Sequence, residues 1–216
     1  MIIHLLDAIN KRRFILASGS PRRVEILKSL GLHFEVIPSK FAEDLDKTQF
    51  PSAADYAKTN ALCKARDVAK RLGAGNYDVI LGSDCIVVAE DGTILEKPHN
   101  AEHARQMLRA LSGHSHHVTT SIALVFGDGR EVVASETTKV TFDTVPEAAI
   151  DAYVATGSPL DKAGAYGIQD GIASSFITGI EGCYWTVIGL PIHLFCAKLL
   201  PFAEEWQKAD MEKEKH

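Results

Sequence analysis

The stretch FILASGSPRR, residues 14–23, decides the fold that this sequence predicts. Its first four residues are apolar and indicate a short strand, and the segment rich in serine and glycine that follows indicates a tight loop. Pro21 suits the first position of a helix, because proline lacks the N–H that has no partner there, and Ser20 suits the N-cap. The stretch therefore predicts a strand, a tight loop and a helix in succession.

Alternating strand and helix patterns continue along the chain. Helical spacing of apolar residues predicts helices over residues 21–30, 53–72, 101–111 and 191–200, with a further helix opening at Pro146. Runs rich in β-branched and aromatic residues predict strands over residues 14–17, 34–37, 79–82, 85–88, 118–126, 131–142, 172–177 and 184–188. The runs 118–126 and 131–142 are joined through a short glycine-rich turn, which indicates an antiparallel pair and hence a mixed sheet.

The domain organisation follows from the length and from the even distribution of these patterns. The 216 residues suit one domain, and they contain no internal repeat, linker or low-complexity segment. We expect an α/β fold in which a mixed twisted sheet is flanked by helices and two lobes lie around a central cleft. The domain spans residues 1–216, with a core over 14–200 and a charged C-terminal tail over 201–216. From Glu204 onward this tail is expected to be a solvated helix extension or a frayed end.

The composition excludes several classes of protein. Hydrophobic residues make up 46% and charged residues 24%, which is typical of a globular chain and argues against disorder. The net charge of −5 argues against a nucleic-acid partner, and no apolar run approaches the roughly 18 to 20 residues of a membrane span. In residues 1–14 the basic cluster follows the apolar residues, the reverse of a secretory signal, so we expect a cytoplasmic protein.

Cysteine and histidine residues give little indication of a metal or redox centre. The four cysteines are widely spaced and form no C-x-x-C pair, so we expect free thiols in a reducing compartment rather than a zinc module or a redox pair. The sequence HSHH, residues 114–117, is predicted to lie in a polar loop with solvated histidines. No pattern of a serine hydrolase triad is visible.

Residues 18–23 are the strongest candidate for a binding site. Gly19 permits close approach of a ligand to the backbone, and the start of the helix offers free N–H groups and the positive end of a dipole. Arg22 and Arg23 add fork-shaped donors that suit phosphate oxygens. The segment is neither a Walker loop nor a dinucleotide fingerprint. Two readings remain: an anion-binding turn, or a well-capped helix with surface arginines.

Asp84 is the second candidate, because it lies between two apolar strand runs. An unpaired carboxylate inside a sheet would be costly, so its position suggests a metal, a cation or a polarised water as partner. A turn-forming aspartate at a strand end is the plain alternative. Lys64, Lys97 and Glu43 are individually uninformative, and solvated side chains are their default reading.

Several motifs together resemble one family. These are LASGSPRR (16–23), GSD (82–84), LEKP (95–98), LSG (111–113), DKAGAYGIQ (161–169) and VIGLP (187–191). In this order they closely resemble the Maf-type nucleoside triphosphate pyrophosphatases, over residues 14–200. The resemblance implies a Maf/ITPase-like fold, a hydrolase that releases the nucleoside monophosphate and pyrophosphate, and a divalent cation, Mg²⁺ or Mn²⁺. It also implies a nucleoside triphosphate as substrate and a homodimer.

The resemblance also assigns roles to residues of this chain. Asp84 matches the proposed general base that activates water at the α-phosphorus, and Glu43 and Asp84 match the positions that hold the metal. The other catalytic positions are Lys64 and Lys97, which neutralise the triphosphate. Oriented carboxylates and positive charge suit this chemistry. The implied substrate-binding residues are Ser18, Arg22, Arg23, Cys85 and Gln169.

Two positions indicate the dTTP/UTP subclass. Arg22 after Ser-Pro and Gln169 after Tyr-Gly-Ile are similar to the branch that acts on dTTP and UTP, whereas the branch for N7-methylated GTP tends to carry Trp at the first position. Gln169 offers a donor and an acceptor to the edge of a pyrimidine. Cys85 departs from the Thr usual in this branch, and Asp170 departs from Gly and is expected to add charge near the base pocket.

The leading hypothesis is therefore a metal-dependent pyrophosphatase for dTTP and UTP, with CTP and modified pyrimidine nucleotides as further substrates. One alternative is a purine house-cleaning pyrophosphatase of the ITP/XTP type, which has a similar architecture but lacks the Ser-x-Ser-Pro-Arg-Arg run. Another alternative is a nucleotide-binding regulator of cell division. The intact set of Glu43, Lys64, Asp84 and Lys97 speaks against a pure binder.

Overall fold

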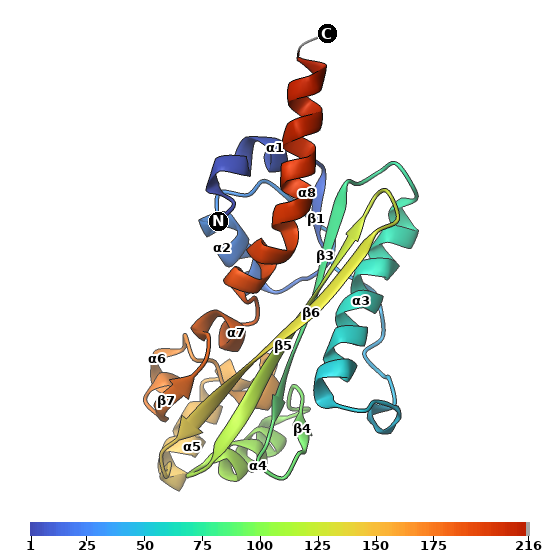
Figure 1. Cartoon of the computed structure of the whole chain (residues 1–216). Helices are drawn as coiled ribbons and strands as arrows, with labels where there is room; N and C mark the ends of the chain where they lie inside the picture. Colours follow the sequence, from blue (N-terminus) through green and yellow to red (C-terminus); the bar gives the residue numbers. More distant parts are fainter. Residues whose placement is uncertain (215–216) are drawn as a thin grey trace.

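A short strand, β1 (Phe14–Leu16), and a long one, β3 (Val79–Val88), lie side by side in parallel in this computed structural model, which describes residues 1–214. Within these residues they belong to a seven-stranded sheet of order β2-β1-β3-β5-β6-β7, and β4 pairs with β3 outside this path. Only β1–β2 and β1–β3 are parallel pairs, and the remaining pairs are antiparallel (Figure 1). The predicted mixed α/β sheet is confirmed.

The other elements alternate along the chain. The remaining strands are β2 (Glu35–Val36), β4 (Ile94–Leu95), β5 (Ser115–Phe126), β6 (Glu131–Phe142) and β7 (Ile177–Glu181). The α-helices are α1 (Leu6–Asn10), α2 (Pro21–Ser29), α3 (Ala53–Leu72), α4 (Ala101–Leu111), α5 (Glu147–Ala155), α6 (Gly171–Ser174), α7 (Tyr184–Ile188) and α8 (Ile192–Lys213). Short 3-10 helices are η1 (Ile3–Leu5), η2 (Lys47–Gln49), η3 (Ser158–Asp161) and η4 (Ala163–Ala165).

The sheet separates two apolar layers at one end of the molecule. Successive residues of a strand point to opposite faces, so Leu16 and Leu81 pack under α2 and α8, whereas Ile15 and Ile80 pack under α3. All four side chains are fully buried. Both faces of β1 and of this part of β3 are therefore covered, which explains why these strands read as continuous apolar runs.

A third core fills the other end of the molecule. It joins α4 and α5 to the far ends of β5 and β6, through residues such as Leu108, Tyr153, Val118 and Val140. Figure 1 shows that the long strands β3, β5 and β6 run from one end to the other, with α8 near one end and α4 and α5 near the other. The two lobes thus share one set of strands.

The boundaries of two helices and one strand agree with the sequence patterns. Helices α3 and α4 occupy the predicted residues 53–72 and 101–111, and β6 occupies 131–142. Ser52 Oγ accepts from the N–H of Asp55, and Asn100 Oδ1 accepts from the N–H of His103, so a polar cap begins each helix. A strong helical period with a cap at its start therefore sufficed to place these helices.

Three local predictions were wrong. Strand β3 runs unbroken through Ser83 and Asp84, because the partner strand β5 continues beside both residues. Residues 184–188 form helix α7, which ends at Gly189 in a left-handed conformation, rather than a strand. Residues 172–177 form most of α6 and only the start of β7. β-branched and aromatic residues favour strands weakly, and the surrounding packing overrides that preference.

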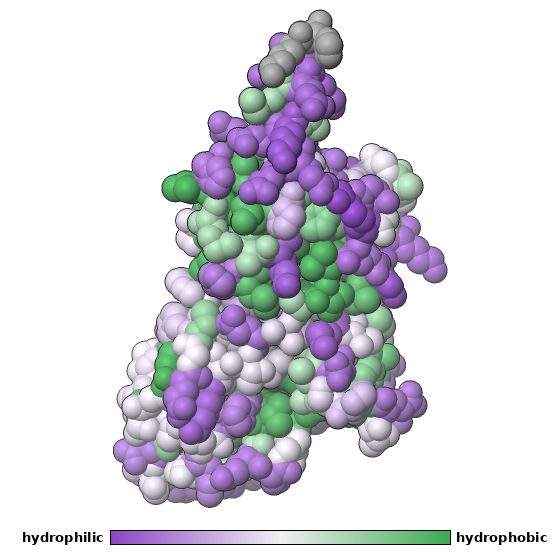
Figure 2. Space-filling view, in the orientation of Figure 1, coloured by the Kyte–Doolittle hydropathy of each residue, from purple (hydrophilic) through white to green (hydrophobic). Residues whose placement is uncertain are grey.

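The last helix is longer than the predicted span 191–200. Helix α8 continues through Pro201 to Lys213, so of the two alternatives for the charged tail the helix extension is the one observed. Phe202 stacks on Phe126 with ring centroids 3.8 Å apart, and Asp210 pairs with Arg12 at 2.7 Å, so contacts beyond the proline hold the helix. Hydrophilic side chains cover its outer end (Figure 2), as expected for the charged tail. None of the helices within residues 1–214 is long and apolar enough to cross a membrane.

His116 contradicts the predicted solvated loop. The side chain is fully buried in β5, its Nε2 lies 2.7 Å from the hydroxyl of Tyr166, and its ring packs on Phe142. Burial lowers its pKa from the ordinary value of 6.5 to about 4, with a smaller contribution from His117. The strand begins at Ser115, so residue 116 points inward.

This histidine should make folding stability dependent on pH. Because the unfolded chain binds the proton more tightly than the folded one, stability falls as the pH drops from 6.5 toward 4, by about 3 kcal/mol near pH 4. We expect the variant His116→Phe to lose less stability over this range than the wild type. Urea unfolding at pH 7.5, 5.5 and 4.5 measures the difference, and parallel losses in both proteins would contradict it.

Candidate active site

A cleft of about 700 Å³ lies beside β3. Its walls come from the β1–α2 turn, the 39–43 loop, α3, the middle of β3, the segment 96–99, the segment 161–169 and the end of α7. Every site residue expected from the sequence lines this one cleft: Ser18, Arg22, Arg23, Glu43, Lys64, Asp84, Cys85, Lys97 and Gln169. Residues separated by more than 150 positions are thereby brought together, whereas their roles remain predictions.

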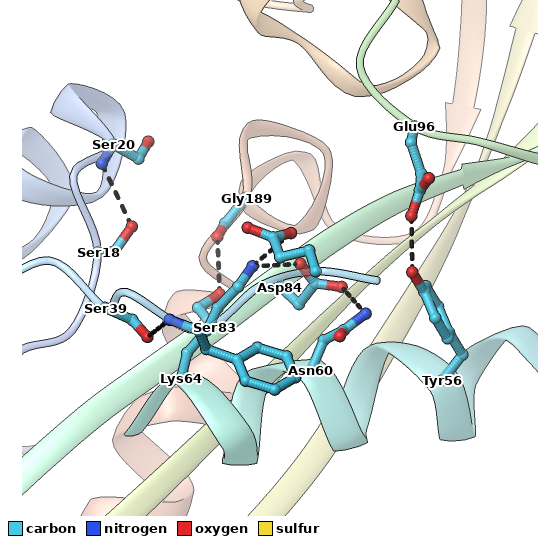
Figure 3. Close-up of polar contacts among 12 residues, drawn as sticks. Ser18, Ser20, Ser39, Tyr56, Asn60, Lys64, Ser83, Asp84, Glu96 and Gly189 are labelled. Carbon is cyan, nitrogen blue, oxygen red and sulfur yellow. Dashed lines mark hydrogen bonds and ion pairs between the residues drawn. The ribbon is translucent and has the colours of Figure 1, made fainter. Parts of the chain in front are cut away.

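The β1–α2 turn forms the cationic wall of the cleft. Ser18 Oγ accepts hydrogen bonds from the N–H of Ser20 at 3.2 Å and from the guanidinium of Arg23 at 2.9 Å (Figure 3 shows the serine pair). Arg23 Nε donates to the carbonyl of Gly189 at 2.9 Å. Burial lowers the pKa of Arg23, and the guanidinium of an arginine stays charged in proteins. The turn is thus fixed to the end of α7.

Asp84 occupies the middle of β3 and faces α3. Its side chain is only 7% exposed, and Lys64 Nζ contacts Asp84 Oδ1 at 2.7 Å. The same ammonium contacts Glu43 Oε2 at 2.8 Å, and Glu43, in the loop between β2 and α3, is half exposed. Lys64 therefore bridges two carboxylates at the border between buried strand and open cleft (Figure 3).

A glycine in β3 makes this bridge possible. A Cβ placed on Gly82 would lie 2.1 Å from the carbonyl oxygen of Ala61 and 3.0 Å from Ala65. Helix α3 thus approaches the strand more closely than any side chain at position 82 would permit. Since Lys64 projects from the same face of α3 as Ala61, the close contact brings its ammonium within reach of Asp84.

The loop that carries Glu43 is anchored on α3. Asp67 accepts hydrogen bonds from the N–H of Lys40 at 2.9 Å and from the hydroxyl of Ser39 at 3.1 Å. The backbone hydrogen bond from Lys40 is the main cause that lowers the pKa of Asp67, so this carboxylate stays charged near neutral pH. The sequence patterns did not reveal this anchor, although it presents Glu43 to the cleft.

The remaining predicted residues lie around the opening. Lys97 and Gln169 are exposed, Arg22 is half-buried, and all three line the cleft. Cys85 is half-buried next to Asp84, and burial raises the pKa of its thiol, so the thiol is neutral at pH 7. The four cysteines form no disulfide within the described residues, as expected.

Asp170 directly follows Gln169 but lies outside the residues that line the cleft. Its carboxylate accepts hydrogen bonds from the hydroxyls of Ser158 at 2.5 Å and Tyr153 at 3.1 Å, and from the N–H of Ile172 at 3.2 Å. It caps helix α6 and lies outside the lining of the cleft. Donors in residues 153–172 thus hold the carboxylate in place, and its effect on a base pocket stays a prediction.

The structure adds two polar residues that sequence reasoning did not single out. Asn60 Nδ2 lies 3.4 Å from Asp84 Oδ2 and is almost fully buried (Figure 3). It precedes Lys64 by one helical turn, so the i, i+4 spacing was the available signal. Glu96 lines the cleft and accepts from Tyr56 and Lys47, each at 2.7 Å. Burial raises the pKa of Glu96, but these donors outweigh it and the net shift is downward.

The donor set around Lys64 fits a divalent cation that arrives with phosphate. No cluster of three or more His, Cys, Asp or Glu side chains that could hold a metal occurs in residues 1–214. Mg²⁺ commonly uses one or two carboxylates and completes its shell with water and substrate phosphates. Glu43 and Asp84, which share one ammonium, are the two carboxylates that could serve in this way. Within residues 1–214 the cleft therefore has no metal site built from protein side chains alone, and substrate and water would complete the coordination.

Comparison with known proteins agrees with the predicted family. The model of the Maf-like protein family matches residues 13–202. A dTTP/UTP pyrophosphatase of Bacillus cereus is 45% identical over 192 residues, covering 88% of this chain and 96% of its own length. A nucleoside triphosphate pyrophosphatase of Dictyostelium discoideum is 46% identical over 189 residues, covering 84% and 87%.

A longer human relative matches as well. The probable bifunctional dTTP/UTP pyrophosphatase/methyltransferase protein of Homo sapiens is 42% identical over 199 residues, which cover 88% of this chain but 32% of the human protein. This chain thus spans about a third of the length of that relative. A family match over nearly the whole chain and identities above 40% lead to one conclusion: the chain belongs to the Maf-like protein family.

Proposed function

We propose that this protein hydrolyses a pyrimidine nucleoside triphosphate, dTTP or UTP, to the monophosphate and pyrophosphate. One observation carries the proposal: the cationic β1–α2 turn and the Asp84–Lys64–Glu43 cluster face the same cleft. Relatives of similar length that are about 45% identical are named dTTP/UTP pyrophosphatase, in agreement with the function predicted from the sequence. The protein is accordingly expected to be a hydrolase of acid anhydrides.

The proposed reaction assigns one step to Asp84. A water oxygen attacks the α-phosphorus while the carboxylate of Asp84 takes up its proton, and the bond from the α-phosphorus to the bridging oxygen breaks to release pyrophosphate. Lys64 and Asn60 hold the carboxylate in place through the contacts described above. Positive charge from Arg23 and Lys97 would stabilise the charge that grows on the phosphate oxygens in the transition state.

The proposed cofactor is Mg²⁺ or Mn²⁺, held by Glu43 and Asp84. A divalent cation bound there would screen the charge of the triphosphate and help to orient its phosphates. When the ligand is absent, Lys64 contacts both carboxylates at 2.7 and 2.8 Å and offsets the charge of one of them, so the pair keeps a net negative charge that suits a cation. With a cation on the carboxylates, the Lys64 ammonium would be available to the phosphates of the substrate.

A panel of nucleoside triphosphates tests this function. Purified protein is incubated with dTTP, UTP, CTP, ITP and XTP, with Mg²⁺, with Mn²⁺ or with a chelator, and pyrophosphate and orthophosphate are measured separately. We expect pyrophosphate and the monophosphate from dTTP and UTP, with activity only when the metal is present. Orthophosphate as the sole product would overturn the attack at the α-phosphorus, and a preference for ITP or XTP would favour a purine enzyme.

Gln169 is expected to influence the choice of nucleotide. Its exposed side chain lines the cleft and offers both a donor and an acceptor. The variant Gln169→Ala should shift the ratio of dTTP to other triphosphates more than it lowers the best rate, with a change of about tenfold in the ratio. Steady-state kinetics on the same panel give the ratio, and an unchanged profile would place the base-reading groups elsewhere.

The homodimer and the cytoplasmic location stay predictions. The dimer follows from the family resemblance, and sedimentation of the purified protein tests it directly. The location follows from the four free thiols, which suit a reducing compartment. Cell fractionation tests the second prediction independently of the first.

A further inference from the structure

The backbone of β3 presents its hydrogen-bonding groups alternately to its two edges. On one edge, the carbonyl of Asp78 accepts from the N–H of Gly127, next to strand β5. On the other edge, the carbonyl of Leu81 accepts from Ala17 and the N–H of Ala89 donates to Thr93. Because both groups of one residue point to the same edge, odd-numbered residues from 79 to 89 face the β1 and β4 side.

The two strands on that side leave a gap between them. Pairing with β1 ends at Leu81, and pairing with β4 begins at Val87. Between these points Ser83 and Cys85 direct their N–H and carbonyl groups to an edge without a strand. Within residues 1–214 neither residue forms a backbone hydrogen bond on this edge, either to the backbone or to a side chain.

Of the two residues in the gap between β1 and β4, Cys85 is the one that lines the cleft. It lines the cavity, whereas Ser83 is fully buried. A buried backbone donor and acceptor that lack a partner are costly, so native proteins pair almost all of them with protein, water or ligand. The gap in the sheet therefore presents one unpaired donor and one unpaired acceptor, both fixed by a rigid strand, to whatever fills the cleft.

Cys85 lies between an apolar wall and the arginines of the β1–α2 turn, Arg22 and Arg23. Its side chain packs with Val87, Val118 and Tyr166, which belong to the apolar core of the lobe that holds α4 and α5. All of these residues also line the cleft. The carboxylates and Lys64 lie on the opposite face of β3, because Asp84 and Cys85 point to opposite sides of the strand.

We propose that the exposed backbone edge at Cys85 reads the base of the nucleotide, by pairing with the imide edge that uracil and thymine share. The base would take the place of the missing strand residue: the N–H of Cys85 donates to a ring carbonyl, and its carbonyl accepts from the N3–H. This is the exchange that two opposed residues make in an antiparallel sheet. The inference rests on the proposed function and extends it from substrate class to recognition.

This mode of recognition predicts which bases the cleft accepts. The Watson–Crick edge of uracil or thymine carries a donor at N3 between two carbonyl acceptors, whereas cytosine carries an acceptor at N3 and a donor at N4. In the same orientation, N3 of cytosine would face the carbonyl of Cys85, an acceptor against an acceptor. The N4 amino group would face the N–H of Cys85, a donor against a donor. A 5-methyl group lies outside the paired edge, so it does not disturb the contact and dTTP and UTP are both accepted.

The first test uses nucleotide analogues with the intact protein. The substrates are UTP, 5-methyl-UTP, 3-methyl-UTP and CTP, and kcat/KM is measured from pyrophosphate release. We expect 5-methyl-UTP to remain within about threefold of UTP, and 3-methyl-UTP and CTP to fall by about 10- to 100-fold, since each lost base contact is worth about that factor. Equal rates for UTP and 3-methyl-UTP would overturn the inference.

A variant removes the backbone donor itself. Proline at position 85 lacks the N–H, and no ladder hydrogen bond is lost because this N–H faces the gap and not β5. For Cys85→Pro we expect a fall in kcat/KM for UTP and a ratio of UTP to 3-methyl-UTP that approaches one. Cys85→Ala keeps both backbone groups, so its UTP to CTP ratio should stay within about threefold of wild type, whatever happens to its rate.

The outcomes separate this inference from the proposed function. If UTP gives no pyrophosphate at all, the proposed function fails and the analogue ratios are not defined. If UTP is hydrolysed but 3-methyl-UTP and CTP are turned over equally well, only the inference about Cys85 fails. Thermal unfolding of both variants shows whether the proline has merely unfolded the strand. If Cys85→Pro is unfolded, the inference is judged by the ratios of UTP to 3-methyl-UTP and of UTP to CTP measured with the wild-type protein.

Discussion

Asp84→Asn is expected to lower turnover by a hundredfold or more while the protein stays folded. Asparagine has nearly the same shape as aspartate, but its amide does not take up the proton of the attacking water. General base catalysis contributes about 10²- to 10⁴-fold, which sets the size of the loss. Glu43 still accepts from Lys64 at 2.8 Å, so the ammonium is not left alone in the variant. Pyrophosphate release under saturating substrate measures the effect.

Asp91→Asn provides a matched control for this variant. Asp91 is an exposed residue in the β3–β4 turn, where its carboxylate accepts from the N–H of Thr93 at 2.9 Å. The same chemical change there should leave turnover within about twofold. If Asp84→Asn retained turnover within a factor of about two, Asp84 would have no part in the chemistry.

The second large effect is expected at Arg23. The variant Arg23→Met keeps the length of the side chain but removes the guanidinium, which links Ser18 Oγ and the carbonyl of Gly189. A hydrogen bond to a charged group is worth about 1.5–3 kcal/mol, so we expect KM for the triphosphate to rise by about 10- to 100-fold. Arg23→Lys restores the charge but not the two fixed contacts, so it should recover only part of the affinity.

The control for Arg23 removes a guanidinium elsewhere. Arg66 is exposed on α3 and pairs with Glu131 at 2.6 Å, away from the residues that line the cleft. Arg66→Met changes the net charge equally and should leave KM within about twofold. An equal rise of KM in both variants would mean that long-range charge, rather than contact in the cleft, attracts the substrate.

The long periodic elements could be predicted from the sequence, and short elements could not. The helix over residues 53–72 has 20 residues, a capping serine and an apolar face, and all three signals agree. In contrast, residues 184–188 form one helical turn from residues that locally prefer a strand, and Gly189 ends it. The charged tail allowed either a helix extension or a frayed end, and the stacking of Phe202 on Phe126, which holds α8 beyond Pro201, is a contact between distant residues that the local pattern does not show.

The identity of the candidate site residues could be predicted, but not how they meet. Motifs indicated Asp84 and Glu43 as site residues. The ion pairs of both with Lys64, however, depend on the close contact of α3 with Gly82, which the motifs do not show. The buried state of His116 depends on where β5 begins. The free edge at Cys85 depends on where two neighbouring strands end, a property of the sheet and not of residue 85 itself.

The long strands also determine how the cleft can move. Because β5 and β6 belong to the apolar cores of both lobes, neither lobe rotates without bending a strand that is paired over its whole length. A hinge needs a few residues that absorb a change of backbone torsion, and a continuous ladder resists that change. We therefore expect a preorganised cleft, in which adaptation to a nucleotide involves the flanking loops and side-chain rotamers rather than a rotation of the lobes.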